Sequence, residues 1–257
     1  MKKKQRSRRK LNDEQKKMIA VIAMLMILIV ILSGYLLLSI LFSKPEGGGE
    51  IEAVSLNENT SPYHVTGTEL ERAGEITIIH SYIPWGSPRR PGEIREIRYI
   101  TIHETDNRRA GADAKAHNNL LITDTSEVTS WHYTVDDSSV YHNIPDNEIA
   151  WNAGDGRTRG GGNINGIGIE MCVNLTGDFE QTLKNTAALA GELLTAYDLD
   201  MTQVRFHEDF MNKECPHRLI SEGRTEEFLQ MIRVAYTRCL EEKKAAEAET
   251  ESEKENG

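Results

Sequence analysis

The longest apolar segment of the chain lies near its start. Residues 18–42 (MIAVIAMLMILIVILSGYLLLSILF) form a run of 25 residues without a charged side chain. As a helix rising about 1.5 Å per residue, this run would extend roughly 37 Å, enough to cross a hydrocarbon core of about 30 Å. The run is longer than the apolar region of about 7–15 residues in a cleaved signal peptide, and no A-x-A-like cleavage site follows it. The pattern therefore predicts an uncleaved transmembrane signal anchor.

Beyond residue 69 the apolar positions form short β-branched runs and longer amphipathic stretches. The predicted strands are Glu75–Ile83, Arg98–His103, Ser130–Asp136, Val140–Ile144 and Ile164–Val173. The predicted helices are Ala110–Ile122 and, from apolar residues three and four positions apart, Phe179–Tyr197 and Arg224–Leu240. Strands that alternate with helices predict one α/β or α+β domain over residues 70–240.

Polar segments flank this predicted domain. Residues 43–69 are rich in Gly, Glu, Ser and Asn and lack sustained periodicity, so they are typical of a linker. Residues 241–257 (EEKKAAEAETESEKENG) are charged and contain no aromatic residue. This composition predicts that the last helix frays into an acidic disordered tail.

Charge is distributed unevenly along the chain. Residues 1–17 carry a net charge of +7 while the whole chain carries −10, so the remainder carries −17. The basic segment before the apolar run predicts a cytoplasmic N-terminus and an extracytoplasmic domain, because positive residues are retained inside. The acidic remainder argues against nucleic acid as a partner, since binding a phosphate backbone requires a basic surface.

Histidine and cysteine residues provide candidate chemistry, but their spacing alone does not identify a site. The three cysteines Cys172, Cys215 and Cys239 are too few for a disulfide framework. None of the eight histidines belongs to an H-E-x-x-H motif. His80 and His103 both end apolar strands, and composition does not rank one above the other as a metal ligand.

Six short segments carry a more specific signal. They are YITIHETDN (99–107), EVTSWHYTVDD (127–137), AWNAGDG (150–156), NGIGIEMCVN (165–174), VRFHEDF (204–210) and KECPHR (213–218). In this order they resemble the type-2 N-acetylmuramoyl-L-alanine amidases, which include bacterial autolysins and phage endolysins and are related to the peptidoglycan recognition proteins. The resemblance extends from Ser81 to about Leu229 and implies a central mixed β-sheet flanked by helices.

The resemblance also implies a zinc site. Its ligands would be His103, His207 and Cys215, a donor set that Zn²⁺ accepts and that leaves a fourth position open for water. A closed, purely structural site would need a fourth protein ligand, for which His217 and Cys172 are the nearest candidates. We expect Cys172 instead to be a small buried apolar residue. His80 falls outside the matched segments and is expected to pack in the core or lie at the surface.

The resemblance also implies catalytic roles for two further residues, Glu170 and Lys213. Glu170 lies in an apolar strand, where a carboxylate is costly unless it has a partner or a function. It would be the general base, although a buried salt bridge is the alternative. Lys213 matches a family lysine that stabilises the developing oxyanion.

The substrate cleft would be lined by residues of two of the matched segments. These are Trp131, His132, Trp151 and Asn152, with core packing an equal alternative for the tryptophans. Where the recognition-protein branch has a catalytic tyrosine, this chain has Trp131, which shifts the acid–base role to Glu170. Where some relatives have histidine, this chain has Asn152, which does not titrate near neutrality.

The sequence thus predicts a membrane-anchored zinc amidase that acts on peptidoglycan. The expected reaction is hydrolysis of the amide between N-acetylmuramic acid and the L-alanine of the stem peptide. Two alternatives stay open: a non-catalytic peptidoglycan receptor or regulator, and a zinc peptidase that cuts within the stem peptide.

Overall fold

The computed structural model describes Ile22, Met26 and residues 69–255. The chain divides into two units between Val54 and Ser55, and the sheet with its helices belongs to the second unit. The predicted anchor at 18–42 lies outside the described residues, apart from Ile22 and Met26, which are helical. None of the helices among the described residues is both long enough and apolar enough to cross a bilayer.

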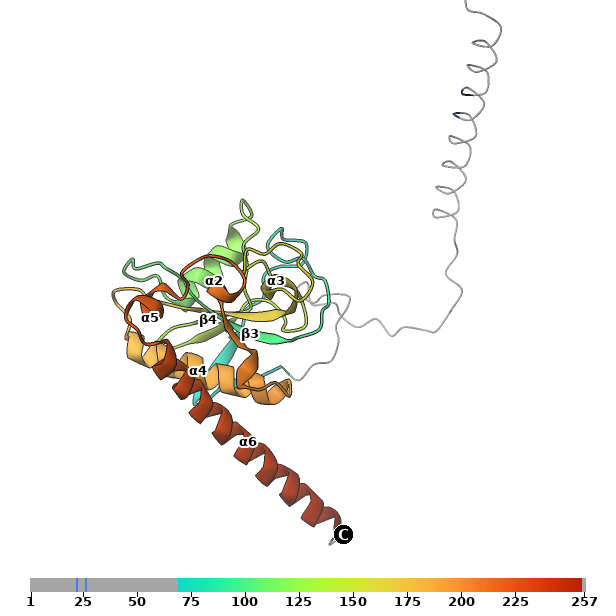
Figure 1. The fold of residues 1–257 in the computed structure, drawn as a ribbon, viewed down its shortest axis with the longest axis vertical. Helices are drawn as coiled ribbons and strands as arrows, with labels where there is room; N and C mark the ends of the chain where they lie inside the picture. The colour runs from blue at the N-terminus through green and yellow to red at the C-terminus, as the bar shows by residue number, and fades with distance from the viewer. Residues whose placement is uncertain (1–21, 23–25, 27–68, 256–257) are drawn as a thin grey trace, which may run out of the picture. The chain divides into compact units, whose positions relative to one another are not determined.

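The domain is built on one mixed β-sheet of seven strands (Figure 1), as predicted. In chain order the strands are β1 (Arg72–Ala73), β2 (Ile76–His80), β3 (Tyr99–Glu104), β4 (Tyr133–Val135), β5 (Val140–His142), β6 (Gly166–Met171) and β7 (Val204–Phe206). Their spatial order is β1-β2-β5-β4-β6-β3-β7. The pairs β1–β2 and β4–β5 are antiparallel, whereas β6, β3 and β7 run parallel to one another at one side. The edge strands β1 and β7 were not predicted.

Side chains alternate along the neighbouring strands β3 and β6, so this part of the sheet has one apolar and one polar face. Ile100 and Ile102 of β3 pair with Ile167 and Ile169 of β6, and all four are fully buried in the main core. Residues at the intervening positions of both strands point to the opposite face. This alternation separates the packing surface of the sheet from the surface that carries its polar side chains.

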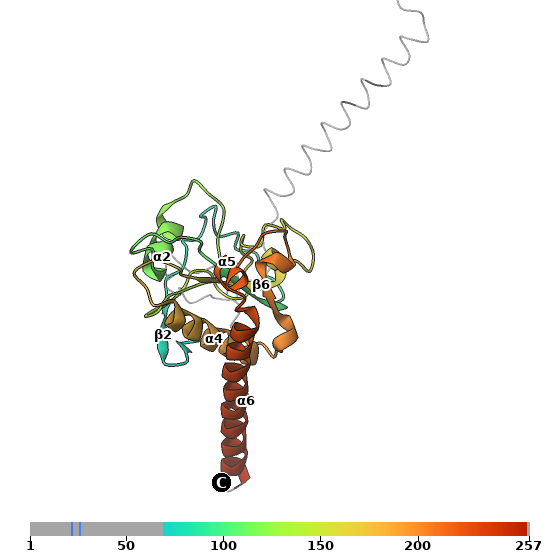
Figure 2. The ribbon, with the colours of Figure 1, turned by 60° about the vertical axis from the view of Figure 1, so that its left-hand side comes forward.

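Helix α4 (Phe179–Ala196) covers the apolar face, and helix α6 (Thr225–Glu255) packs against α4 (Figures 1 and 2). The start of α4 is fixed by Asp178, whose side chain accepts hydrogen bonds from the backbone N–H groups of Glu180 and Gln181. A Cβ atom at Gly191 of α4 would lie 2.7 Å from the backbone nitrogen of Tyr236 in α6. Only glycine therefore allows the two helices to pack this closely.

The other helices are shorter and lie next to the connecting loops. They are α2 (Ala114–Thr123), α3 (Gly162–Asn165), α5 (His217–Ser221) and two 3-10 turns, Met201–Gln203 and His207–Asp209. The helix predicted at Ala110–Ile122 begins only at Ala114, because Asp113 caps its N-terminus. The strand predicted from Ile164 begins at Gly166, since residues 162–165 form the turn of α3.

The prediction of a disordered tail from residue 241 is corrected by the structure. Helix α6 continues without interruption to Glu255. This segment consists largely of Ala, Glu and Lys, which are strong helix formers. Lys243 also forms an ion pair with Asp198 at 2.9 Å, which ties the first turn of the extension to the domain. The highly charged segment after residue 240 is therefore a solvent-exposed helix rather than a disordered tail.

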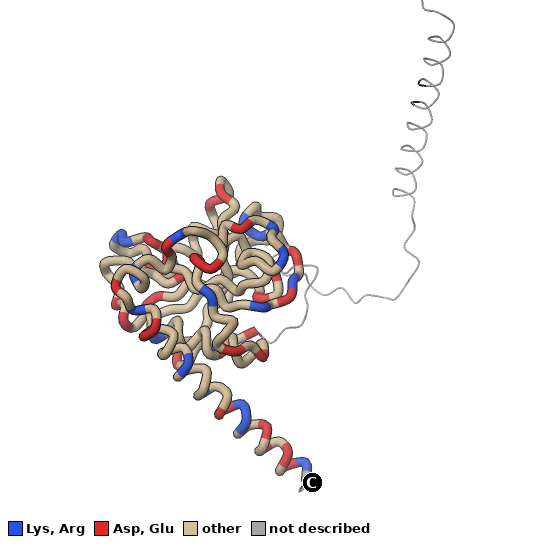
Figure 3. Tube along the Cα trace, viewed as in Figure 1, with Lys and Arg blue, Asp and Glu red and all other residues tan. Residues whose placement is uncertain are grey.

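The described surface mixes charges of both signs. Figure 3 shows Lys and Arg interspersed with Asp and Glu along residues 69–255. Such a surface offers little long-range steering toward a charged polymer, so recognition of a substrate has to depend on local contacts.

A buried ion pair yields a test of the fold. Glu148 accepts two hydrogen bonds of 2.8 Å from the Arg90 guanidinium, and both side chains are 1% exposed. Replacing Glu148 by Gln should lower the free energy of unfolding by about 3–5 kcal/mol, because it removes the buried carboxylate that accepts two hydrogen bonds from the Arg90 guanidinium. Urea denaturation at pH 7 measures this change. Glu96→Gln, which breaks an exposed pair with Arg98, is the control, and an equal loss in both variants would contradict the expectation.

Candidate metal centre and active site

Three residues from separate segments converge at one end of the parallel strands. His103 lies in β3, His207 directly follows β7, and Cys215 precedes α5. Their potential ligand atoms all lie within 4.8 Å of one another, and all three side chains are buried. Ile102 pairs with Phe206, so the two histidines follow at adjacent positions of neighbouring parallel strands. The sheet register therefore brings together two residues that are far apart in sequence.

The two imidazoles are arranged to share a metal ion. Their Nδ1 atoms lie 3.0 Å apart, and the rings meet at 71°. Burial lowers the pKa of His103 well below its usual value, assisted by the charges of His207 and Lys213. Burial also lowers the pKa of His207. Both rings are therefore neutral near pH 7, the form in which imidazole binds a metal.

Cys215 completes a donor set that suits zinc. Burial and the nearby Glu170 raise the pKa of the Cys215 thiol to about 12. A thiol in this environment becomes a thiolate only when a cation compensates the charge. Two neutral imidazoles and one such thiolate are a ligand set that Zn²⁺ favours, and three protein ligands leave one position open.

A carboxylate ties the Cys215 loop to the sheet. Glu104, next to His103 in β3, accepts a hydrogen bond of 2.8 Å from the backbone N–H of Arg218 at the start of α5. The backbone N–H of Glu208 also donates to the Cys215 carbonyl at 3.4 Å. These bonds hold the third candidate ligand against the strands that carry the first two. We did not predict the role of Glu104, since a carboxylate beside a histidine gives no such signal in sequence.

Glu170 lies directly beside the metal group. It pairs in register with His103, so both side chains point from the same face of the sheet. Its Oε2 atom is shielded from solvent and has no hydrogen-bond partner in the part of the chain that the structure describes. Burial raises the pKa of Glu170 to about 8, while Lys213 opposes the shift. Among the described residues no ion pair involves Glu170, so the alternative of a buried salt bridge is not observed.

Lys213 is exposed and lies two residues before Cys215. Its charge lowers the pKa of His103, His207 and Glu170. The ammonium group therefore acts electrostatically on all three side chains, as a residue at the entrance of the site would.

Trp131 does not line a cleft. It is 8% exposed and packs in a small apolar cluster with Ile83, Leu121, Ile144 and Ala150. Its Nε1 atom donates a hydrogen bond of 2.7 Å to Thr134. The prediction of a substrate contact is corrected in favour of the core-packing alternative.

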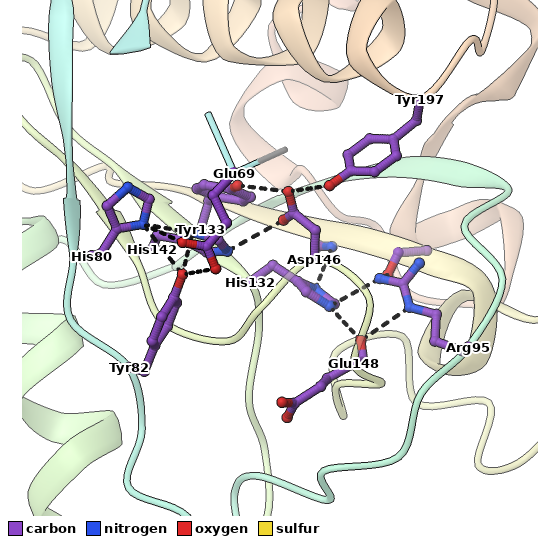
Figure 4. A network of polar contacts seen from close by, with 12 residues as sticks. Glu69, His80, Tyr82, Arg95, His132, Tyr133, His142, Asp146, Glu148 and Tyr197 are labelled. Carbon is purple, nitrogen blue, oxygen red and sulfur yellow. Dashed lines mark hydrogen bonds and ion pairs between the residues drawn. The ribbon is translucent and has the colours of Figure 1, made fainter. Parts of the chain in front are cut away.

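His132 is likewise an interior residue (Figure 4). Its Nδ1 atom accepts a hydrogen bond of 3.0 Å from the backbone N–H of Gly168, and its Nε2 atom lies 2.9 Å from the Glu148 carbonyl. Burial, together with the charge of Arg95, lowers the pKa of His132 to about 3. A fully buried imidazole with both nitrogens in use has no free group for a substrate, so this predicted role is also corrected.

Asn152 lies beside the metal group, whereas the contacts of Trp151 are with Arg157 and Ser130. Trp151 is half-buried, and the Arg157 guanidinium stacks over its ring at 5.2 Å. Asn152 is 7% exposed, and neither of its side-chain polar atoms has a hydrogen-bond partner. Its carboxamide covers Gly168 of β6, where a Cβ atom would lie 2.8 Å from Asn152 Cγ.

The remaining histidine and cysteine candidates stay outside the metal group. Neither Cys172 nor His217 joins the three residues that converge within the described part of the chain. Cys172 is 2% exposed, and its Sγ atom lies 3.9 Å from the Nδ1 atom of His117. His217 is exposed and pairs with Glu214. His80 contacts His142 at 3.1 Å in a separate polar network (Figure 4), which agrees with the packing role expected for it.

Comparison with known proteins agrees with this geometry. The family model for N-acetylmuramoyl-L-alanine amidase matches residues 93–218, which include all three candidate ligands. The solved catalytic domain of XlyA is 39% identical to this chain, which covers 99% of it with a TM-score of 0.57. The chain belongs to the N-acetylmuramoyl-L-alanine amidase family.

Other members of this amidase family show the same extent of similarity. XlyA and CwlH of Bacillus subtilis (strain 168) are 41% and 42% identical over 145 and 146 residues, or 56% of this chain. The structure of PlyL is 28% identical with a TM-score of 0.56. The chain covers 48% of XlyA and 57% of CwlH, so it spans about half the length of these two relatives.

The raised pKa of Glu170 predicts that this residue destabilises the metal-free fold. With a folded pKa of about 8 against an ordinary 4.5, the cost is absent below about pH 4.5, grows as the pH rises, and is complete above about pH 8. Glu170→Gln should therefore raise the free energy of unfolding of zinc-stripped protein at pH 8 by on the order of 2–4 kcal/mol, at 1.36 kcal/mol per pKa unit. The gain should vanish near pH 4.5.

Denaturation curves at several pH values provide the measurement. Glu249→Gln, on the exposed end of α6, is the matched control and should change little at any pH. A pH-independent effect of Glu170→Gln would show that the carboxylate is not held in its neutral form.

Proposed function

We propose that this protein is a zinc-dependent N-acetylmuramoyl-L-alanine amidase that hydrolyses the bond between N-acetylmuramic acid and L-alanine in peptidoglycan. The observation that carries the proposal is the convergence of His103, His207 and Cys215 beside Glu170. A structural metal site would not require an unpartnered carboxylate on the adjacent strand. XlyA and CwlH, which carry the name of this activity, support the choice of substrate.

In the proposed mechanism, zinc held by His103, His207 and Cys215 would polarise the scissile carbonyl and acidify a water molecule. Glu170 accepts the proton of the attacking water at its carboxylate and returns it to the leaving amine. Burial raises the pKa of Glu170 in the metal-free protein, and a zinc ion bound beside it would lower that pKa again. Lys213 stabilises the negative charge that develops on the carbonyl oxygen.

We further propose that residues 18–42 anchor the enzyme in the membrane, with its N-terminus cytoplasmic and residues 70–240 on the extracytoplasmic side. The 25-residue apolar run and the basic segment before it support this arrangement. The proposed linker at 43–69 would confine the enzyme to peptidoglycan near the membrane.

Digestion of purified muropeptides by the full chain in detergent tests the reaction. We expect free stem peptides that begin with L-alanine, identified by mass spectrometry. Glu170→Gln should reduce the rate by at least about 100-fold, the usual contribution of a general base, and should retain bound zinc. Cys215→Ser should lose both zinc and activity.

Two other product patterns would contradict this function. Cuts within the stem peptide would identify a peptidase, and muropeptide binding without products would identify a receptor. Exposed Lys244→Ala, in the helix extension, is a control that should leave the products and their rate unchanged.

The anchor is tested by fractionation of expressing cells. The full chain should remain in the membrane after alkaline carbonate washing and be extracted by detergent, whereas a chain lacking residues 1–42 should not. External protease should degrade the domain in spheroplasts. Release of the full chain by carbonate, or protection from the protease, would contradict the proposed arrangement.

A further inference from the structure

The orientation of the two histidine rings determines which atoms remain for other contacts. His103 and His207 direct their Nδ1 atoms toward each other at 3.0 Å, within the metal group. A metal bound through both Nδ1 atoms leaves each Nε2 atom protonated, since a neutral imidazole has one N–H. Each ring therefore needs an acceptor on its far side, and such a partner fixes the ring orientation.

Residues 152–154 lie on that far side. A Cβ atom at Gly154 would be 3.8 Å from the Nε2 atom of His207. The backbone carbonyl of Ala153 also interacts with the His207 ring and partly offsets the effect of burial, which lowers its pKa. The segment thus supplies an acceptor for one of the two histidines through its main chain.

For His103, no hydrogen bond from the Nε2 atom to an acceptor in residues 152–154 is formed with standard geometry. Its Nε2 atom and both polar side-chain atoms of Asn152 are buried and make no hydrogen bond of standard geometry. Asn152 nevertheless lies near enough to counter, in part, the burial that lowers the pKa of His103. A buried polar group without a hydrogen bond is costly, so a donor and an acceptor that are buried close together favour pairing.

The segment that carries Asn152 is held firmly. The Oδ1 atom of Asn163 in α3 accepts hydrogen bonds from the backbone N–H groups of Asn152 at 2.8 Å and Ala153 at 2.7 Å. Gly168 provides the space for the Asn152 carboxamide, because any side chain there would collide with it. A fixed backbone leaves rotation of the carboxamide as the only movement needed to complete the contact.

We infer that Asn152 is a positioning residue of the metal centre. Its side-chain oxygen accepts a hydrogen bond from the Nε2–H group of His103, and the Ala153 carbonyl accepts the corresponding bond from His207. This role differs from the substrate contact expected from the sequence, and it rests on the proposed zinc site. Residues 152–154 would then form one platform that sets the orientation of both histidine ligands.

Zinc affinity measured without substrate tests the inference. The full chain in detergent is titrated against a chromogenic zinc chelator, and the dissociation constant is compared among variants. Asn152→Leu, matched in shape but lacking an acceptor, should weaken zinc binding about 10–100-fold, as loss of such partners usually does. Asn152→Asp, which keeps an acceptor oxygen, should bind zinc within a few-fold of the unaltered chain.

Asn185→Leu is the matched control, since Asn185 in α4 is similarly buried and its carboxamide donates a hydrogen bond to the Asp136 carbonyl. It should lower stability without changing zinc affinity. Unchanged affinity in Asn152→Leu, with a raised KM, would overturn the inference and restore the substrate contact. Equal loss in the Leu and Asp variants would also overturn it. Failure of the unaltered chain to bind zinc would instead overturn the proposed function, and the inference with it.

Discussion

The parallel register between β3 and β6 is the constraint on which the site depends. It sets His103 opposite Glu170 and, through the next strand, His103 beside His207. Because side chains alternate along a strand, a shift of one residue would turn these groups into the apolar core and expose isoleucines in their place. The packing of α4 against this apolar face therefore maintains the position of the chemical groups as well as the stability of the domain.

Most regular elements could be predicted from the sequence because they are long enough to show a period. Helix α4 ends one residue before its predicted limit, and the five predicted strands all exist, four of them shorter than expected. The strands β1 and β7 have two and three residues and form only by pairing with neighbours, so no local pattern marks them. The helical extension to Glu255 was missed because charge density was weighed above helix propensity.

The candidate site was predictable only in part. The sequence positions of His103, His207 and Cys215 follow no metal-binding spacing. The family resemblance identified them as ligands, and the structure places them close together. The cleft residues show the limit of that approach, since Trp131 and His132 occupy a matched segment but are covered in the structure. His132 is enclosed by Arg95 and the Glu148 carbonyl, which approach from other loops. Contacts of this kind are long-range and leave no local signal.

Helix α6 has a mechanical consequence beyond packing. Its last apolar contact with the domain is near Cys239, which is 3% exposed, whereas residues 241–254 are exposed to solvent. The extension projects from the domain in both views of the ribbon. At about 1.5 Å per residue, the part beyond Leu240 forms a rod roughly 22 Å long. A fluorophore or second domain attached after Glu255 would thus be held at a distance by a stiff spacer.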